Sequence, residues 1–271
     1  GLMYFKNRYY SVLMGSFVSR DPLGYVDGLS MYLGYFGGQS ADPWGYYQSD
    51  FHFYVIYILL KEKGFCKDEA YKIAGASQYV DDDDVTEPIY TKAENRANFH
   101  FRGSTANRAT VRDDPTARIN LQNAIDGYSA ASLKASTDVT ATTTSASMIL
   151  GARLHTYADT WSHEGFTAHH NDAINERTGS KRPNTGHADA DEGGNDPDLP
   201  FKNINKALEA AQKIYGFLPK GDCCGSKVPS DWNDVRKILV PLLAIKEVDE
   251  KNRVPSFKAK IKELYKEDVD Y

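Results

Sequence analysis

The chain has 271 residues, of which 41% are hydrophobic and 25% are charged, so it can form one or two domains with a well-developed core. Its formal net charge of -5 and its pI of about 5.8 argue against a protein that binds nucleic acid through a basic face. They do not exclude a nuclease whose metal ions meet the phosphate directly. No stretch approaches the roughly 20 apolar residues of a membrane span, and no secretory signal opens the chain, so we expect no stable membrane insertion.

The first 46 residues differ in composition from the rest, because they are rich in Gly, Tyr and Phe and carry turn signals every few residues. Short aromatic runs between such turns predict β-hairpins. The segment resembles the C-terminal end of the RHS repeat-associated core domain, through its GLMYFKNRYY opening, its GSFVSRDPLG centre and its closing DPWG. In that family the core is part of a β-shell around a variable C-terminal toxin.

The RHS resemblance also implies self-cleavage. The two DP-x-G aspartates of that family form an aspartyl pair that frees the toxin, and the matching residues are Asp21 and Asp42. Two carboxylates that share a proton can act as general base and acid. Cleavage would fall just after Tyr46, between an RHS segment at 1–46 and a toxin domain at 47–271. The alternative is that both aspartates only begin turns, as Asp-Pro often does.

From residue 51 onward, apolar spacing and capping residues predict a mainly α domain. The expected helices are Phe51–Lys63 (ended by Gly64), Asp68–Tyr79, Ile119–Ala135, a long helix from the Ser136–Ser147 tract through His163, Asn203–Tyr215, Asp231–Ala244 (with Ser230 as N-cap) and Ser256–Lys266. Residues 102–118 and 171–200 are polar and are expected to be loops. The three cysteines, Cys66 and the adjacent pair Cys223 and Cys224, lack the spacing of a disulfide framework, so we expect buried or reducible thiols.

The strongest chemical signal is a set of metal-ligand residues at helical spacing. His155, Asp159 and His163 are four residues apart, so on a helix they project from nearly the same face. Two imidazoles and a carboxylate on one stripe form half of a metal site. The pair His187 and Asp191 repeats the His-x3-Asp spacing.

Upstream residues supply further ligand types, namely His52, Asp81 or Asp82, and His100. Each has an ordinary interpretation when taken alone. His52 fits a core histidine, the acidic run at 81–84 fits a solvated turn, and His100 fits an aromatic strand between two phenylalanines. Together with the His-x3-Asp pairs, they favour a metal site.

The order of these residues resembles the zinc-dependent phospholipase C and S1/P1 nuclease superfamily, an all-helical fold that holds three zinc ions in a cleft. The pattern of that family runs His, Asp, His, then His-x3-Asp on one helix, then His, then His-x3-carboxylate. The resemblance implies a multi-helical domain with two or three zinc ions, preceded here by the hairpin-rich RHS remnant. The implied ligands are His52, Asp81 or Asp82, His100, His155, Asp159, His163, His187 and Asp191.

By this resemblance, Asp159 bridges two ions, one held with His52 and the other with His155. Asp81 or Asp82 would join His100 on the His155 ion. The third ion would take His163, His187 and Asp191.

The gap after Asp159 is shorter than in the family, which leaves His169 or His170 as alternatives to His163. The final carboxylate, Asp191, is more often Glu there. The chain also resembles an uncharacterised bacterial helical family, through FHFYV at 51–55 and SQYVDD at 77–82.

These resemblances predict a metal-dependent phosphodiester hydrolase that is the toxin of an RHS protein, with Asp159 and a water-orienting Asp82 in the catalytic site. The absence of a basic stripe favours a phospholipid substrate, and single-stranded nucleic acid is the rival. A non-catalytic, metal-stabilised helical module is the alternative class. The RHS carrier implies a secreted effector that is delivered to a target cell, with the RHS shell and a cognate immunity protein as partners.

Overall fold

The chain divides into two compact units, Gly1–Ala41 and Asp42–Tyr271, and each is described by itself. The computed structural model describes residues 2–5, 8–11, 16–17, 49–83, 85–86, 93–105, 108–135, 142–166, 168, 199–221, 223 and 230–271. Asp21, Asp42 and Tyr46, for which self-cleavage is predicted, lie outside these residues.

The first unit contains a small antiparallel sheet. Its strands are β1 (Leu2–Phe5), β2 (Arg8–Ser11) and β3 (Ser16–Phe17), in the order β1-β2-β3. The register pairs Leu2 with Ser11 and Tyr10 with Phe17. These strands lie at the start of the segment for which β-hairpins are predicted.

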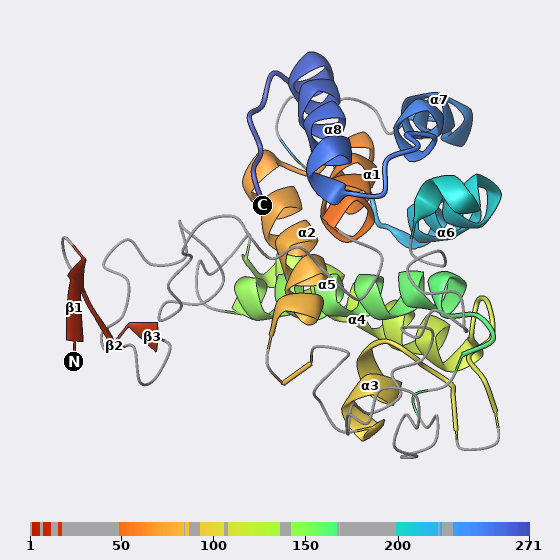
Figure 1. Ribbon diagram of the computed structural model, residues 1–271, viewed down its shortest axis with the longest axis horizontal. Helices are drawn as coiled ribbons and strands as arrows, with labels where there is room; N and C mark the ends of the chain where they lie inside the picture. Colours follow the sequence, from red (N-terminus) through yellow and green to blue (C-terminus); the bar gives the residue numbers. More distant parts are fainter. Residues whose placement is uncertain are drawn as a thin grey trace. The chain divides into compact units, whose positions relative to one another are not determined.

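The described part of the second unit is mainly helical, as predicted (Figure 1). Its elements are the π-helix η1 (Asp50–Val55), α1 (Ile56–Glu62), α2 (Lys67–Asp82), α3 (Ala93–Phe99), α4 (Pro115–Ala135), α5 (Thr142–Ser162), the 3-10 helix η4 (Pro200–Lys202), α6 (Ile204–Phe217), α7 (Trp232–Leu243) and α8 (Glu250–Tyr265). Helix α3 falls where no helix is predicted.

Helix α5 is central to the packing, because α2, α3, α4 and α6 all contact it. In Figure 1 it runs beside α4 while α2 crosses it. Leu150, Leu154, Ala158 and Trp161 recur every three or four residues along α5 and are fully buried. This apolar stripe is what an amphipathic helix turns toward a core. The remaining face of α5 is therefore free to present polar residues to α2 and α3.

The apolar run that opens the helical unit lies inside it. Every residue from Phe51 to Leu60 is at most 1% exposed, and these residues form η1 and most of α1. A helix that is apolar on all sides has to be buried. Gly64 ends this segment with a φ of 90°, in the left-handed region that glycine adopts at a helix end, which is the role predicted for it. His52 therefore lies in the core as part of a fully buried element.

A glycine sets how closely α2 approaches α5. A Cβ added at Gly151 would lie 2.3 Å from the carbonyl oxygen of Ile73 and 2.6 Å from the Cβ of Ala76. Only glycine permits this approach. The crossing brings the C-terminal half of α2 onto the face of α5 that begins with Gly151.

Two helices start earlier than predicted because aspartates cap them. Helix α4 begins at Pro115, where Asp114 Oδ1 accepts hydrogen bonds from the backbone N–H of Thr116 at 2.8 Å and of Ala117 at 3.1 Å. Helix α8 begins at Glu250, where Asp249 accepts from the N–H of Lys251. Each cap satisfies N–H groups that would otherwise be unpaired, so the helix can form ahead of its apolar residues.

The predicted N-cap of α7 is wrong by one residue. Asp231 caps the helix, since its side chain accepts from the N–H of Asn233. The Ser230 hydroxyl instead donates to the buried carboxylate of Glu62. Ser230 therefore ties the start of α7 to the end of α1 rather than capping a helix.

The prediction of free thiols is wrong for two of the three cysteines. Cys66 and Cys223 form a disulfide, with their Cα atoms 5.0 Å apart and a sequence separation of 157 residues. Cys66 is the N-cap residue of α2, and the N–H of Cys223 donates to the carbonyl of Gly64. The disulfide thus joins the start of α2 to the segment that follows α6. Sequence spacing gave no sign of it, because the two sulfurs meet only through the fold.

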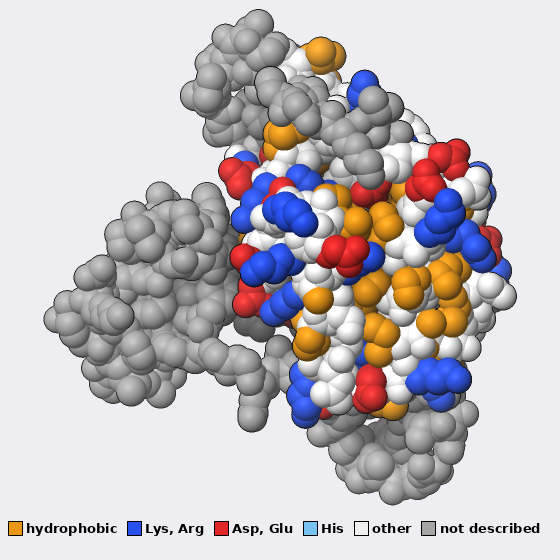
Figure 2. All heavy atoms as spheres, turned by 90° about the horizontal axis from the view of Figure 1, so that it is seen from above, with side chains coloured by type: hydrophobic (Ala, Val, Ile, Leu, Met, Phe, Trp, Pro, Cys, Tyr) orange, Lys and Arg blue, Asp and Glu red, His pale blue; other side chains and the backbone are white. Residues whose placement is uncertain are grey.

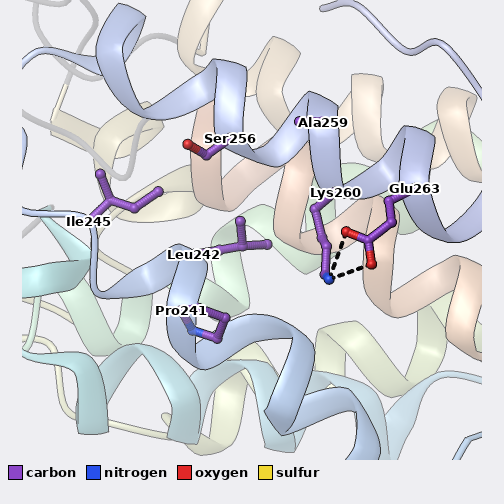
Figure 3. A pocket seen from close by; sticks show the side chains of 7 residues that line it. All are labelled: Pro241, Leu242, Ile245, Ser256, Ala259, Lys260 and Glu263. Atoms are coloured by element: carbon purple, nitrogen blue, oxygen red, sulfur yellow. Dashed lines mark hydrogen bonds and ion pairs between the residues drawn. The ribbon is translucent and has the colours of Figure 1, made fainter.

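None of the helices in the described part of the chain combines the length and hydrophobicity needed to cross a bilayer. On the face shown in Figure 2, acidic side chains are interspersed among the Lys and Arg side chains around an apolar strip. A surface groove of about 410 Å³ lies between α7 and α8, and Figure 3 shows the ion pair of Lys260 with Glu263 on its wall. The groove is lined by residues from Pro241 to Glu263, which supply no side chain to the cluster described below.

Candidate metal centre

Helix α5 supplies the core of a buried histidine and carboxylate cluster. His155 and Asp159 are one turn apart on α5, with His155 Nε2 3.2 Å from Asp159 Oδ2. His163 follows in the turn after the helix. Its N–H donates to the carbonyl of Asp159 at 2.9 Å, which continues the helical hydrogen-bond pattern. All three side chains are fully buried. The stripe predicted from the four-residue spacing is therefore present on one face.

The π-helix η1 brings His52 to the same carboxylate. His52 Nε2 lies 3.2 Å from Asp159 Oδ1, the oxygen that His155 does not face. Its ring stacks on that of His155, with the centroids 3.9 Å apart. A π-turn inside a helix is often found at functional sites, because it rotates a side chain out of the α-helical register. Here the turn includes His52 itself.

The turn after α3 supplies His100. Its Nδ1 lies 3.0 Å from Asp159 Oδ2 and 3.1 Å from His155 Nε2. Its Nε2 lies 2.8 Å from the carbonyl oxygen of Thr86, which can only accept a hydrogen bond. The proton is therefore assigned to Nε2, and a lone pair is left on Nδ1. Metal-binding histidines are usually held in this way by an outer hydrogen bond.

The end of α2 supplies a second carboxylate. Asp81 Oδ1 lies 3.5 Å from His155 Nε2 and 3.7 Å from His100 Nδ1, and the side chain is 11% exposed. Asp82 points elsewhere: it is exposed, and it accepts a hydrogen bond from the hydroxyl of Tyr271. The sequence left open which of the two aspartates joins the cluster, and the structure brings in Asp81.

Four donor atoms of this cluster lie close together: Asp81 Oδ1, His100 Nδ1, His155 Nε2 and Asp159 Oδ2. We refer to these four atoms as the donor tetrahedron. Five of the six distances between them measure between 3.0 and 3.7 Å. Ligands bound to zinc at about 2.0–2.1 Å in tetrahedral geometry would stand about 3.3 Å apart. Lone pairs this close repel unless a proton or a cation lies between them. The donor set could therefore hold a metal ion.

The residues form two groups that could hold metal ions. One group is His52, His155 and Asp159, and the other is Asp81, His100 and His155, with the ligand atoms of each group within 4.8 Å of one another. His155 belongs to both, and Asp159 faces both through its two oxygens. This arrangement allows adjacent ions to share Asp159 as a bridge.

The protonation states suit metal binding. Burial lowers the pKa of His52, of His100 and of His155, the last to about 4, so all three imidazoles are neutral near pH 7. Burial opposes ionisation of Asp159, but its interactions with His163, His155 and His100 outweigh this and hold its pKa well below the ordinary value. Neutral imidazoles and an ionised carboxylate are the forms that bind metals.

His163 lies beside the cluster without joining either group. Its Nδ1 is 2.9 Å from the carbonyl of His100 and 3.5 Å from Asp159 Oδ2, and its ring stacks on Phe101 with the centroids 4.4 Å apart. In this position it supports the turn that carries His100. The remaining predicted ligands, His187 and Asp191, and the alternatives His169 and His170 lie outside the described residues.

Sequence reasoning missed Thr86 and Phe101. Thr86 contributes a main-chain carbonyl, which every residue has, so no sequence pattern could identify it. Phe101 gave only the weak signal of an aromatic residue next to a candidate ligand.

A family of unknown function (DUF6765) matches the chain over residues 47–129 and 99–271. The chain belongs to the DUF6765 family. The matched residues include every member of the cluster, and the match begins at residue 47. No curated protein and no solved structure was found to match the chain. The DUF6765 match brings no activity with it.

Proposed function

We propose that the chain is a zinc-dependent phosphodiester hydrolase of the phospholipase C kind, which follows an RHS segment as its toxin domain. The donor tetrahedron of Asp81, His100, His155 and Asp159 supports this most directly, because five of its six edges are close to the spacing of zinc ligands. His52, next to the second oxygen of Asp159, adds donors for an adjacent ion.

Zinc bound here would supply Lewis acidity, which lowers the pKa of water and offsets charge on a phosphoryl group. The residues of the chain would hold the zinc ions in place. Thr86 fixes the His100 tautomer, and Asp159 faces both positions through its two oxygens. The one partly exposed member is Asp81, so the side of the cluster next to the end of α2 is where we expect water and substrate to enter.

A phospholipid headgroup is the favoured substrate. The net charge is -5, and the face in Figure 2 mixes both signs of charge, whereas a nucleic-acid groove usually presents a positive track. Single-stranded nucleic acid is the rival substrate, because metal ions can bind a phosphate without a basic surface.

One observation favours a second candidate, a structural metal site. The tetrahedron has four protein donors, three fully buried and the fourth 11% exposed. Closed four-ligand sites are typical of structural zinc, whereas catalytic sites keep a position for water. Under this candidate the metal only stabilises the helices, and His52 is a buried neighbour of the site.

Changing His52 distinguishes a catalytic metal site from a structural one. We expect elemental analysis of the purified chain to show two to three zinc ions, and the His155→Ala/Asp159→Ala variant to lose all of them. His52→Ala should keep the zinc of the tetrahedron but lose at least about tenfold in the hydrolysis of phosphatidylcholine vesicles or single-stranded DNA. A full set of zinc with no hydrolysis by the wild-type chain would favour the structural site. No zinc, even after zinc is supplied, would end the proposal.

Delivery is proposed on separate grounds. The resemblance of residues 1–46 to an RHS core, and a family match that begins at residue 47, support a toxin carried by an RHS shell. The Cys66–Cys223 disulfide suits an exported protein, since disulfides persist in oxidising compartments. A secreted effector of this kind would need an immunity protein in the cell that makes it. Co-purification of the chain with the product of a neighbouring reading frame would test this.

A further inference from the structure

Residues 267–271, the C-terminal strap, cross the elements that carry two of the cluster's donors. At its start, Glu267 accepts a hydrogen bond from the Tyr57 hydroxyl and forms an ion pair with Lys61 at 3.0 Å. Tyr57 and Lys61 both lie on α1. Further along, the carbonyl of Asp270 accepts from the Tyr71 hydroxyl on α2 at 2.9 Å, and Val269 is buried. In Figure 1 the end of the chain lies beside α2.

The last residue of the strap touches the sequence neighbours of two cluster members. The Tyr271 hydroxyl donates to Asp82, which follows Asp81 on α2. Its ring lies 5.1 Å from that of Phe53, which follows His52 on η1. Its N–H donates to the Tyr54 hydroxyl at 3.5 Å. One tyrosine therefore connects the end of α2 to η1.

These contacts matter because the donors differ in how firmly they are held. His155 and Asp159 are fixed by α5, while His52 and Asp81 come from separate elements. The two edges of the tetrahedron that involve Asp81, at 3.5 and 3.7 Å, are longer than the three others, which lie between 3.0 and 3.2 Å. Asp81 sits at the last turn of α2, where helices fray. Gln78 Nε2 donates to Asp81 Oδ2 at 3.4 Å from within the same helix. A contact on the next residue can add support from outside the helix.

We propose that Tyr271 is a positioning residue of the metal centre, which holds Asp81 at metal-binding distance through Asp82 and Phe53. This inference rests on the proposed metal-dependent function. It implies that the strap contributes to metal affinity and not only to folding. Partners that orient ligands from outside typically change metal affinity by 10–100-fold when they are removed.

The test compares two tyrosines that make the same kind of bond. Tyr271→Phe removes a hydroxyl that donates to a carboxylate beside Asp81, and Tyr57→Phe removes one that donates to Glu267 at the other end of the strap. We expect Tyr271→Phe to weaken zinc binding about tenfold in chelator competition, and to change the visible absorption of the cobalt-substituted protein. Tyr57→Phe should lower the thermal midpoint to a similar extent but leave zinc affinity within about twofold of the wild-type value.

The outcomes distinguish a failure of the proposed role of Tyr271 from a failure of the proposed zinc-dependent function. If the wild-type chain binds zinc and Tyr271→Phe binds it equally well, with an unchanged cobalt spectrum, the inference is overturned and the proposed function stands. Equal losses of affinity in both variants would also overturn it, because the strap would then act through stability alone. A wild-type chain that binds no zinc overturns the function and the inference together.

Discussion

Asp159 is the residue around which the cluster is organised, because both of its oxygens face imidazoles on separate elements. Oδ1 faces His52, and Oδ2 faces His100 and His155. A single buried carboxylate among neutral histidines is costly unless a cation compensates its charge. The arrangement is easier to explain as a metal centre than as a folding element, since replacing it with packed apolar side chains would often be neutral or stabilising for the fold.

A half-buried acid elsewhere in the helical unit gives a test that does not involve the metal. Burial raises the pKa of Glu250 to about 7, while its carboxylate accepts a 2.9 Å hydrogen bond from the N–H of Ser49. The unfolded chain loses this proton near pH 4.5, so between that pH and 7 only the folded state holds it. Stability should therefore fall as the pH rises through this window. Glu250→Gln, which keeps the acceptor, should be more stable than the wild type at pH 8 by about 1–3 kcal/mol.

Urea unfolding at pH 4 and pH 8 measures the effect of Glu250→Gln. The gain should be absent at pH 4, and the same change at the exposed Glu247 should give no gain at either pH. A gain of equal size at both values would show that the carboxyl group does not titrate in this window.

At the residue scale, spacing alone predicted the part of the cluster that lies on α5, while His52, His100 and the upstream aspartate followed from the family resemblance. His155, Asp159 and His163 lie one turn apart, and the helical period places them on one face without any tertiary information. The choice between Asp81 and Asp82 could not be made in the same way, because it depends on where α2 ends and which way its last turn faces. The Tyr271 contact that occupies Asp82 comes from 189 residues away.

At the element scale, the α2–α5 crossing is the feature that brings Asp81 to α5. Gly151→Ala would gain helix propensity, worth about 1 kcal/mol, but its Cβ would meet the Ile73 carbonyl at 2.3 Å. We expect the clash to win and to destabilise the chain by about 1–3 kcal/mol in denaturant unfolding. Gly127 on α4 is the matched control, because a Cβ there meets nothing within 4 Å. Gly127→Ala should stabilise by about 0.5–1 kcal/mol.

Zinc binding gives the Gly151 prediction a second readout. If α2 is pushed away from α5, Asp81 leaves the tetrahedron, so Gly151→Ala should bind zinc more weakly while Gly127→Ala does not. Unchanged stability and zinc affinity in Gly151→Ala would mean that the two helices can separate without cost, against the geometry of the crossing.

The helix boundaries show which parts of a helix can be predicted from the sequence pattern and which cannot. Most of the long helices follow from apolar spacing, but α4 and α8 begin at Pro115 and Glu250, ahead of their apolar stripes. The prediction placed the start of α8 after Pro255, yet the helix accommodates that proline near its N-terminus. Aspartate caps decide these starts, and Asp is common in loops as well, so its presence alone does not locate a helix.

The disulfide links distant elements and should contribute strongly to stability. Cys66 and Cys223 are separated by 157 positions in the sequence, so their bond closes a long loop. Reduction, or the Cys66→Ser/Cys223→Ser variant, should lower the free energy of unfolding by about 2–5 kcal/mol. Thiol titration of the unreduced, denatured chain should find one free cysteine of three. Three free thiols would contradict the pairing.

At the scale of the whole molecule, cleavage after Tyr46 would couple the delivery of the helical domain to its activity. The family match begins at residue 47, directly after the cleavage position implied by the RHS resemblance, and η1 with its His52 begins at Asp50. In the zinc phospholipase C superfamily, processing exposes an N-terminal amine and carbonyl that complete the ligands of one zinc. A new terminus at Tyr47 would lie five residues before His52.

We therefore predict that a chain beginning at Tyr47 binds zinc at least about tenfold more tightly, and hydrolyses phosphodiesters faster, than the full chain with Asp42→Asn. By the RHS resemblance, Asp42→Asn should prevent self-cleavage. Zinc content after dialysis and hydrolysis of a common substrate measure both effects. The matched control adds Gly-Ser in front of Tyr47, which keeps the whole helical unit but displaces its amine. If the added residues change nothing, the amine is not a ligand. If the full-length variant has equal zinc and equal activity, cleavage serves release alone, because the buried cluster would then be complete from α5, η1, α2 and the His100 turn without a new terminus.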